Sequence, residues 1–199
     1  PLVKILGKEM VIRVADICSK IQKVNVYVAT DSKKIAKVVK KYGYNYIFTS
    51  SSCLTGTDRV AEASKKIRSK IFINVQGDEP TINPSDIKKV IETKKKFPNH
   101  VICGYDKVHD FENPASINLP KVVVNSKGEL IYISRALVPG KKKESQKIQY
   151  HKQVCIYAFN KKQLKKFYSM KKKSETESFE DIEILRFFEL NEKIKMVKL

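Results

Sequence analysis

The fold is decided by the stretch Ile71-Phe72-Ile73-Asn74-Val75-Gln76-Gly77-Asp78-Glu79-Pro80. Its first half, residues 71–75, is a short apolar run of the kind that forms a buried strand. The run ends at a glycine followed by two carboxylates, and open α/β sheets bind ligands beyond the carboxyl ends of their strands. The same residues also suit an ordinary polar turn. The stretch therefore predicts a strand that ends in either a turn or a binding site.

Strands and helices alternate around this stretch. Residues 24–30 and 46–48 are rich in β-forming residues and end in turn residues, so we expect two more strands there. Apolar side chains recur at helical spacing between the strands, which predicts amphipathic helices with one buried face each. The inward positions are Val11, Val14, Ala15, Cys18 and Ile21, then Ile35, Val38, Val39 and Tyr42, then Val60, Ser64 and Ile67, and finally Ile87, Val90 and Ile91. Such alternation is typical of a parallel, doubly wound sheet.

Capping residues mark the predicted helix ends. Asp31 or Ser32 suits the N-cap of the helix that precedes Gly43, and a glycine commonly ends a helix. Thr57 or Asp58 suits the N-cap of the next helix. These residues therefore have an ordinary structural interpretation beside any functional one.

The second half of the chain has a different pattern. Residues 121–125 and 130–134 resemble strands and flank Ser126-Lys127-Gly128-Glu129, which predicts an antiparallel hairpin. We expect further strands at 101–103, 154–159 and 194–199, helices at 161–170 and 177–190, and a mobile polar loop at 141–149. The predicted fold class is therefore α/β, with a doubly wound, mostly parallel sheet and an antiparallel hairpin subregion in the second half.

The composition is that of one globular domain. The chain has 199 residues, 42% hydrophobic and 31% charged, which suits one well-buried core rather than two. No stretch approaches the roughly 18 consecutive apolar residues of a membrane span, and no export signal is visible. We therefore expect a soluble cytoplasmic protein without membrane insertion. The cysteines, at positions 18, 53, 103 and 155, are too widely spaced for a Cys-x-x-Cys site and are expected to be reduced.

Net charge is the strongest compositional feature, at a formal +19. A strongly basic chain can bind nucleic acid or another polyanion. Arginine, which recognises phosphate by a planar fork, occurs only at positions 13, 59, 68, 135 and 186, and the short lysine runs are scattered. A solvated lysine surface without specific nucleic-acid binding is therefore our main interpretation. A basic polyanion-binding protein is the alternative.

Several segments taken together resemble one family. They are Val28-Ala29-Thr30-Asp31, Gly56-Thr57-Asp58-Arg59, Asn74-Val75-Gln76-Gly77-Asp78-Glu79-Pro80, Ile133-Ser134-Arg135 and Ile156-Tyr157-Ala158-Phe159. In this order they resemble the CMP-Kdo synthetases, also called 3-deoxy-manno-octulosonate cytidylyltransferases, over nearly the whole chain. The resemblance implies a Rossmann-like nucleotide-diphospho-sugar transferase fold in one domain of residues 1–199. Its nucleotide-binding half would be roughly residues 1–98, and its sugar-binding and dimerisation half roughly 99–199.

The resemblance also implies a reaction. CTP and Kdo would give CMP-Kdo and pyrophosphate, with Mg²⁺ as cofactor, in a homodimer that serves lipopolysaccharide synthesis. The anomeric hydroxyl of the sugar would attack the α-phosphorus of CTP in line. Mg²⁺ would offset the charge that develops on the phosphoryl oxygens.

Particular residues receive roles from the same resemblance. Asp78 is expected to bind Mg²⁺, which one carboxylate and retained waters can hold, and Asp78 and Gln76 are the expected catalytic residues. The nucleotide side would contain Gly56, Thr57 and Arg59. The sugar side would contain Gln76, Arg135, Gln153, Tyr157 and Glu183. Arg135 suits an acidic sugar because its fork can pair with a carboxylate, and Glu183 and Arg186 match a Glu-x-Leu-Arg-like element of the family.

The chain also departs from the family pattern. Family members begin with a strand and a basic phosphate loop ahead of the position of Pro1, and they continue past the position of Leu199 into a segment whose first Asp completes the metal site. Neither is among the 199 residues, so we expect the isolated chain to be inactive. Gln153, Cys155 and Ile184 differ from the family residues on the sugar side. A catalytically inactive fragment and a CMP-sugar synthetase for a different acidic sugar therefore remain as alternatives.

Overall fold

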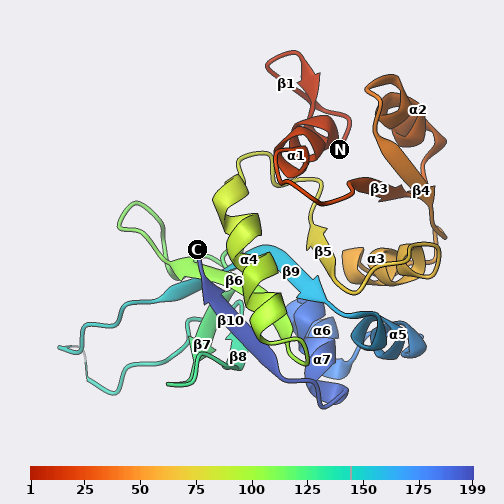
Figure 1. Cartoon of the computed structure of the whole chain (residues 1–199). Coiled ribbons are helices and arrows are strands. Elements are labelled where there is room, and N and C mark those ends of the chain that lie inside the picture. The colour runs from red at the N-terminus through yellow and green to blue at the C-terminus, as the bar shows by residue number, and fades with distance from the viewer. Residues whose placement is uncertain (144) are drawn as a thin grey trace.

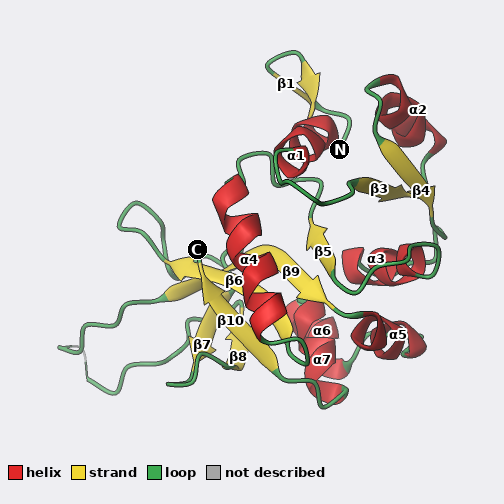
Figure 2. Cartoon of the chain, viewed as in Figure 1, coloured by secondary structure: helices red, strands yellow, loops and turns green. Residues whose placement is uncertain are grey.

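The computed structural model describes residues 1–143 and 145–199; residue 144, within the predicted loop 141–149, lies outside the described residues. The helices are α1 (Met10–Ser19), α2 (Lys33–Lys41), α3 (Gly56–Ser64), α4 (Pro84–Lys96), α5 (Lys161–Ser169), α6 (Glu175–Glu180), the 3₁₀ helix η1 (Glu183–Leu185) and α7 (Arg186–Glu189). The strands are β1 (Lys4–Ile5), β2 (Lys8–Glu9), β3 (Tyr27–Thr30), β4 (Asn45–Phe48), β5 (Phe72–Val75), β6 (Val101–Lys107), β7 (Lys121–Val124), β8 (Leu130–Ser134), β9 (His151–Phe159) and β10 (Ile194–Lys198). The predicted α/β class is confirmed (Figure 1, Figure 2).

The strands form a mixed sheet around β9, which corrects the prediction of a mostly parallel one. β9 runs antiparallel to β5, β6 and β7, and β6 pairs in parallel with β10. The remaining parallel pair, β3 with β4, forms a separate two-stranded sheet. β9 opposes its neighbours because the chain reaches it from the hairpin region rather than through a crossover helix. A parallel order would require such a crossover.

Capping side chains fix the helix starts. The Ser32 hydroxyl accepts a hydrogen bond from the Ile35 amide at 3.4 Å, which confirms one of the two N-caps predicted for α2. The prediction for α3 was wrong by two or three residues, because its N-cap is Thr55, whose hydroxyl accepts from the Asp58 amide at 3.2 Å. Gly43 follows α2 with φ of 79°, a conformation that favours glycine.

In the second half of the chain, one local prediction is confirmed and one is wrong. The hairpin β7–β8 is confirmed, and Gly128 takes φ of 70° in its turn. The single helix expected at 177–190 is instead divided into α6, η1 and α7. The division falls at Asp181, whose left-handed φ of 49° ends α6, because an α-helix cannot continue through that conformation.

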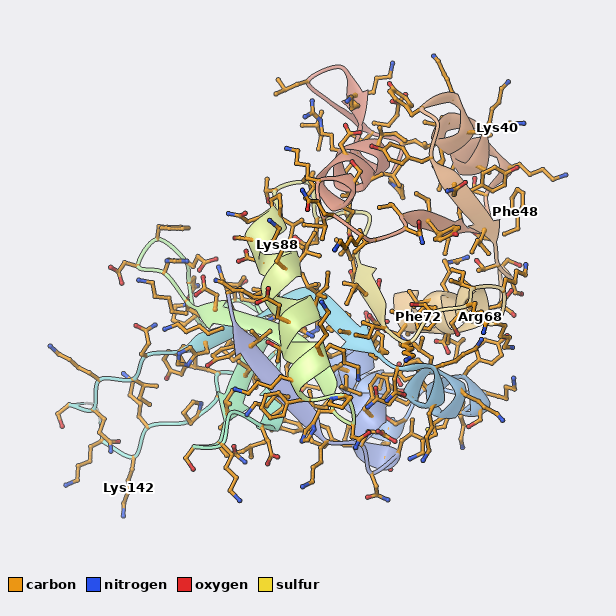
Figure 3. The ribbon with its side chains drawn as sticks, in the orientation of Figure 1. Lys40, Phe48, Arg68, Phe72, Lys88 and Lys142 are labelled. Atoms are coloured by element: carbon orange, nitrogen blue, oxygen red, sulfur yellow. The ribbon has the colours of Figure 1, made fainter. Side chains whose placement is uncertain are left out.

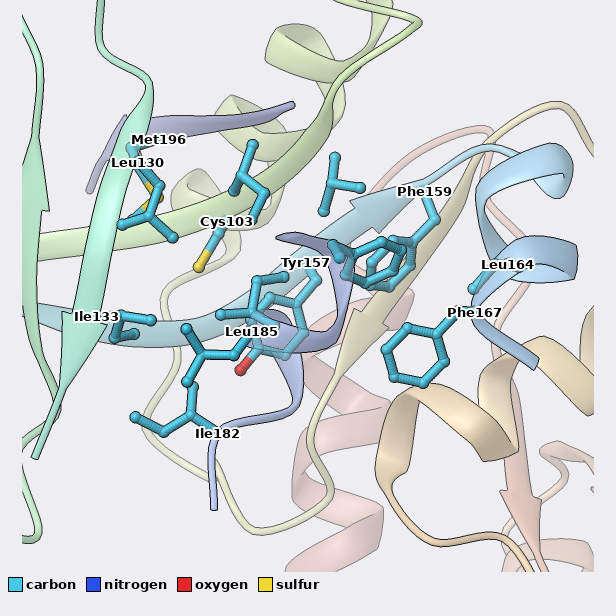
Figure 4. Close-up of a cluster of buried hydrophobic side chains, with 14 of the residues drawn as sticks. Cys103, Leu130, Ile133, Tyr157, Phe159, Leu164, Phe167, Ile182, Leu185 and Met196 are labelled. Atoms are coloured by element: carbon cyan, nitrogen blue, oxygen red, sulfur yellow. The ribbon is translucent and has the colours of Figure 1, made fainter. Parts of the chain in front are cut away.

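The core consists of three apolar clusters that follow the alternation of the strands. Cys103, Tyr157 and Phe159 point to the face covered by α5 and α7, where they pack with Phe167 and Phe187 (Figure 4). Neighbouring residues of the same strands point to the opposite face and pack against α4; they are Ile102, Ile156 and Ala158. A third, much smaller cluster, made by Val11, Ile12 and Val39, joins α1 to α2. The two-sided burial explains why residues 154–159 of β9 are continuously apolar.

Charged side chains cover the outside of this core. Lys40 on α2 and Lys142 on the long loop both extend away from the body of the molecule (Figure 3). Among the described residues no helix is both long and apolar enough to cross a bilayer. All four cysteines are free thiols, as predicted.

Candidate functional site

The Glu183 carboxylate joins the two most specific sequence motifs. It accepts a hydrogen bond from the Thr57 amide at 2.8 Å and one from the Gln76 side-chain nitrogen at 3.3 Å. Thr57 lies in the first turn of α3, Gln76 directly follows β5, and Glu183 begins η1. The structure therefore brings together three predicted site residues that are distant in the sequence.

Burial disfavours the charged form of Glu183, and nearby hydrogen-bond donors partly offset that effect. Its side chain is buried, with 9% of the residue exposed, and burial raises the pKa of its carboxyl group above the usual value. The Thr57 amide lowers that pKa in part, and the position at the start of α3 favours a negative charge because of the helix dipole. The carboxylate keeps acceptor capacity beyond these two bonds. It can therefore accept a further hydrogen bond from a ligand hydroxyl.

Tyr157 and Gln153 form a second polar pair close to Glu183. The Gln153 side-chain nitrogen donates to the Tyr157 hydroxyl at 2.9 Å. Burial, with smaller contributions from Cys155 and Glu183, raises the pKa of Tyr157 well above its usual value. The phenol is therefore neutral at physiological pH and can act as a hydrogen-bond donor to an oxygen.

Two cysteines lie beside this pair. The Gln153 side-chain nitrogen lies 3.8 Å from the Cys103 sulfur, and burial raises the pKa of Cys155 to about 11. Burial also raises the pKa of Cys103. Because the thiolate is the reactive form, these side chains act here as apolar packing groups rather than as nucleophiles.

Asn74 belongs to the same site, although the sequence prediction gave it no role of its own. It lies on β5 opposite Tyr157 on β9, and its side-chain nitrogen contacts the Thr57 hydroxyl at 3.5 Å. The residue is only 6% exposed. The available sequence signal was one amide side chain inside the apolar run 71–75, since buried polar groups usually have a specific partner.

A buried ion network fixes the loop that carries Thr57. The Arg186 guanidinium is completely buried and donates to both Asp58 oxygens, at 2.8 and 3.2 Å. It also donates to both Glu177 oxygens at 2.6 Å, and it lies 3.9 Å from the centre of the Phe167 ring. The Asp58 carboxylate is therefore a structural group that ties α3 to α6 and α7.

Gly56 and Arg59, two of the three predicted nucleotide residues, line one cavity. A cavity of about 1090 Å³ is bordered at one end by Gly56, Arg59, Gln76 and Asp78. The Arg59 guanidinium donates to the Thr49 hydroxyl at 2.6 Å and lies 3.5 Å from the Asp31 carboxylate. The ends of β3 and β5 and the start of α3 thus meet at this polar end of the cavity.

Asp78 is an exposed carboxylate beyond the end of β5. Within residues 1–143 and 145–199 no hydrogen bond or ion pair engages it, and no group of three or more His, Cys, Asp or Glu side chains is placed to hold a metal. Burial, together with the Asp78 charge, raises the pKa of the neighbouring Glu79. This arrangement fits Mg²⁺ delivered with a nucleotide, because Mg²⁺ typically uses one or two carboxylates, several waters and the phosphates of the substrate.

The hydrogen bonds of the Arg135 side chain go to backbone carbonyl oxygens rather than to the polar residues around Glu183. Its guanidinium donates to the carbonyl oxygens of Glu180 at 2.5 Å, Ile117 at 2.8 Å and Asp181 at 3.3 Å. Among the described residues no hydrogen bond joins it to Thr57, Gln76 or Glu183. Three of the five guanidinium N–H donors are thus used on backbone carbonyls, and two are left for a ligand.

Comparisons with known proteins identify the family of the chain. The family model for cytidylyltransferases matches residues 1–194. The 3-deoxy-manno-octulosonate cytidylyltransferase of Rickettsia canadensis is 42% identical over 171 residues, which is 84% of this chain and 67% of the relative. The protein of the same name from Rickettsia felis is 41% identical over 167 residues, which is 81% of this chain and 65% of the relative. The chain therefore spans about two thirds of the length of these relatives.

A solved structure resembles the chain over its whole length. It is CMP:2-keto-3-deoxy-manno-octonic acid synthetase complexed with CTP, with a TM-score of 0.91 and 30% sequence identity. The match covers 100% of this chain and 82% of the other. The similarity therefore includes α3 and η1, which carry Thr57 and Glu183, and β5, which Gln76 directly follows.

Proposed function

The chain belongs to the cytidylyltransferase family, among the 3-deoxy-manno-octulosonate cytidylyltransferases, and from this premise we propose that it transfers CMP from CTP to Kdo or a closely related acidic sugar. The observation that carries the proposal is the position of Glu183 between Thr57 and Gln76. That position links the Gly-Thr-Asp-Arg segment to the end of β5, which belong to two of the five segments that carry the family resemblance.

The proposed reaction is one displacement at phosphorus. The anomeric hydroxyl oxygen of the sugar forms a bond to the α-phosphorus of CTP, the bond from that phosphorus to the bridging oxygen breaks, and pyrophosphate leaves. The hydroxyl proton is released to solvent. Asp78 would hold Mg²⁺, which supplies charge neutralisation at the phosphoryl oxygens in this type of transfer.

Gly56, Thr57 and Arg59 are proposed for the nucleotide side. The start of α3 would ordinarily attract a phosphate, but the Glu183 carboxylate already accepts the Thr57 amide. We therefore assign α3 to the part of the nucleotide remote from its triphosphate. Arg59, which contacts Asp31 and Thr49, is one of the cations that line the cavity and is proposed to contact an anionic group of the ligand.

Gln76, Gln153, Tyr157 and Glu183 are proposed for the sugar side. Their two amides, one neutral phenol and one carboxylate can donate to and accept from several sugar hydroxyls. Arg135 is proposed to pair with the sugar carboxylate through the two N–H donors that its backbone bonds leave free.

The wider setting of the proposal comes from the relatives. The curated relatives carry the name of a Kdo-activating enzyme, and we extend this to a cytoplasmic homodimer that supplies lipopolysaccharide synthesis. Gln153 and Cys155 lie in the proposed sugar site. A different acidic sugar is therefore the second candidate substrate.

Pyrophosphate release tests the proposal. The 199-residue chain is compared with the same chain extended, ahead of Pro1 and after Leu199, by the corresponding segments of the Rickettsia canadensis relative. Each is mixed with CTP, Mg²⁺ and either Kdo, another acidic sugar such as a sialic acid, or no sugar. We expect release that requires both CTP and an acidic sugar, in the extended protein. If the extended protein released no pyrophosphate with any acidic sugar, the proposed function would be wrong.

A further inference from the structure

Hydrogen bonds fix both the backbone and the side chain of Arg135, which directly follows β8. Its amide donates to the Glu180 carboxylate at 2.7 Å, and its carbonyl oxygen accepts from the Lys121 ammonium at 2.7 Å. Its guanidinium donates to the carbonyl oxygens of Glu180, Ile117 and Asp181. Because ordering a long side chain costs conformational entropy, this set of partners indicates that the orientation of Arg135 matters.

Lys121 is a buried cation that holds Arg135 and one of its partners together. It begins β7, its residue is 0% exposed, and its ammonium donates to the carbonyl oxygens of Arg135 and, at 2.8 Å, of Ser116. Ser116 precedes Ile117, whose carbonyl oxygen accepts from the Arg135 guanidinium. Burial lowers the pKa of Lys121 below its usual value, so the charge is kept there against a desolvation cost. Lys121 therefore fixes the backbone of Arg135 relative to the loop that receives its side chain.

Glu180 fixes Arg135 through a second set of bonds. Its carboxylate accepts from the Arg135 amide and from the Ser134 hydroxyl, the latter at 2.5 Å. Its own carbonyl oxygen accepts from the Arg135 side chain, because the last carbonyl groups of a helix such as α6 have no partner within the helix. The next residue, Asp181, also accepts from the guanidinium and lies two positions before Glu183. Glu180 therefore connects Arg135 to the segment that carries the sugar-side carboxylate.

The bonds to backbone carbonyls leave a defined pair of donors on Arg135. Each terminal nitrogen of the guanidinium carries two hydrogens and, within the described residues, uses one of them on a carbonyl oxygen. One N–H group therefore remains on each terminal nitrogen. A carboxylate can accept from such a pair with its two oxygens.

We propose that Lys121 and Glu180 are positioning residues for the sugar carboxylate, and that they act by orienting this pair of Arg135 donors before the sugar binds. Neither residue needs to contact the sugar. A donor pair that is already ordered loses less entropy when it binds its ligand. This inference rests on the proposed function, because the contact between Arg135 and the sugar carboxylate belongs to that proposal.

A double-mutant cycle separates positioning from a purely structural role. A residue that only supports the fold would affect both substrates, and its loss would add to the loss of Arg135. A residue that acts through Arg135 would affect the acidic sugar alone, and its loss would have no further effect once the guanidinium is removed. The cycle uses Lys121→Met, Arg135→Ala and the variant with both changes.

The experiment uses the extended protein described above. Pyrophosphate release with Mg²⁺ is measured while the acidic sugar is varied at saturating CTP, and then while CTP is varied at saturating sugar. Lys127→Met, an exposed lysine in the turn of the same hairpin, is the matched control. Circular dichroism shows whether each variant is folded. Glu180→Ala and Glu180→Gln, each also combined with Arg135→Ala, provide a second cycle that serves if Lys121→Met does not fold.

We expect Arg135→Ala and Lys121→Met each to lower kcat/KM for the sugar by about tenfold to a hundredfold, as loss of a charge-assisted hydrogen bond does. The Michaelis constant for CTP should stay unchanged, and the double variant should lose no more than Arg135→Ala. Glu180→Gln should recover most of the activity that Glu180→Ala loses, because glutamine keeps one acceptor oxygen for the Arg135 amide.

The possible outcomes distinguish this inference from the proposed function. Additive losses in the double variants, equal effects on both substrates, or no effect of Lys121→Met and Glu180→Ala on the sugar would overturn the positioning role and leave the proposed function standing. An extended wild-type protein that released no pyrophosphate with any acidic sugar would overturn the proposed function, and this inference with it.

Discussion

At the scale of single residues, Glu183 combines two opposed requirements. Its carboxylate must accept the Thr57 and Gln76 donors, yet it is buried where a charge is unfavourable. A site of this kind sacrifices some folding stability for a preorganised acceptor. The raised pKa of the carboxyl group is the measurable sign of this conflict.

The burial of the Glu183 carboxyl group predicts how folding stability depends on pH. Because the pKa of Glu183 is raised, the folded chain keeps a proton in a range above pH 4.5 where the unfolded chain has lost it. Folding stability from this group is therefore present at low pH and lost as the pH rises through the folded pKa, by about 1.4 kcal/mol for each pKa unit. When the free energy of unfolding is measured with urea from pH 4 to pH 8, it should fall less for Glu183→Gln than for the wild type. The exposed Glu189→Gln is the control, and the interpretation fails if both variants follow the wild-type slope.

Asp78 is expected to contribute to catalysis but not to the stability of the folded protein. It is exposed and, in the described part of the chain, unengaged, so Asp78→Asn should leave the urea midpoint unchanged. In the extended protein this variant should lose Mg²⁺-dependent pyrophosphate release by a factor of about 100 or more, as loss of a charge-stabilising group at a reaction centre typically does. Asp110→Asn, an exposed aspartate outside the site, is the matched control. Near wild-type turnover in Asp78→Asn would remove Asp78 from the proposed metal site.

At the scale of elements, the buried ion network decides how α3 meets α6 and α7. Arg186 pairs with both Asp58 and Glu177 in the protein interior, and its removal would leave two buried carboxylates without a positive partner. We expect Arg186→Met to lower the free energy of unfolding by about 3–5 kcal/mol. The exposed Arg68→Met should change it by about 0.5 kcal/mol or less.

A combined variant separates charge from packing in this prediction. Arg186→Met together with Asp58→Asn and Glu177→Gln removes all three charges at once. Much of the lost stability should return, because the cost of Arg186→Met alone comes from the unpaired carboxylates. If the triple variant is as unstable as Arg186→Met, contacts such as that with Phe167, rather than charge, hold the elements together.

Local patterns were sufficient for most elements and insufficient for their pairing. The helical spacing around Ile35 and the N-cap at Ser32 predict α2 correctly, because both depend on residues a few positions apart. The antiparallel pairing of β5 with β9 was not predictable in this way, since it depends on contacts between residues more than eighty positions apart, such as Phe72 with Phe159. The break at Asp181 was missed because periodicity cannot detect one left-handed residue.

The candidate site was also predicted only in part from the sequence. Family resemblance pointed to Thr57, Gln76 and Glu183, and the structure brings these three together. Asn74 was missed because only the fold places it opposite Tyr157. The backbone contacts of Arg135 were equally hidden, because a carbonyl acceptor leaves no trace in the sequence.

At the scale of the whole molecule, one buried lysine makes the stability of the folded chain depend on pH in the alkaline range. The Lys94 ammonium donates to the carbonyl oxygens of Pro98 and His100 and to the Gln163 side chain. Burial lowers the pKa of Lys94 to about 8 from its ordinary 10.5. The unfolded chain therefore binds more protons between these values, and stability should rise with pH across that window.

The comparison of two lysine variants tests this effect. Lys94→Met should remove the rise, whereas Lys95→Met, an exposed neighbour on the same helix, should keep it while sharing any general effect of lysine titration on the basic chain. Urea midpoints measured from pH 7.5 to 10.5 provide the slopes. Parallel slopes in the two variants would show that Lys94 has an ordinary pKa in the folded protein.

The smallest of the three core clusters affects the order in which parts of the protein unfold. Val11, Ile12 and Val39 hold α1 and α2 together apart from the two larger clusters around β6 and β9. Few buried apolar contacts mean a low free energy of local unfolding. In low urea, amides of α2 and β4 should therefore exchange through a partial opening that leaves β6 and β9 protected. Thermal unfolding would then proceed in two cooperative steps, with the segment from α1 to β4 melting first.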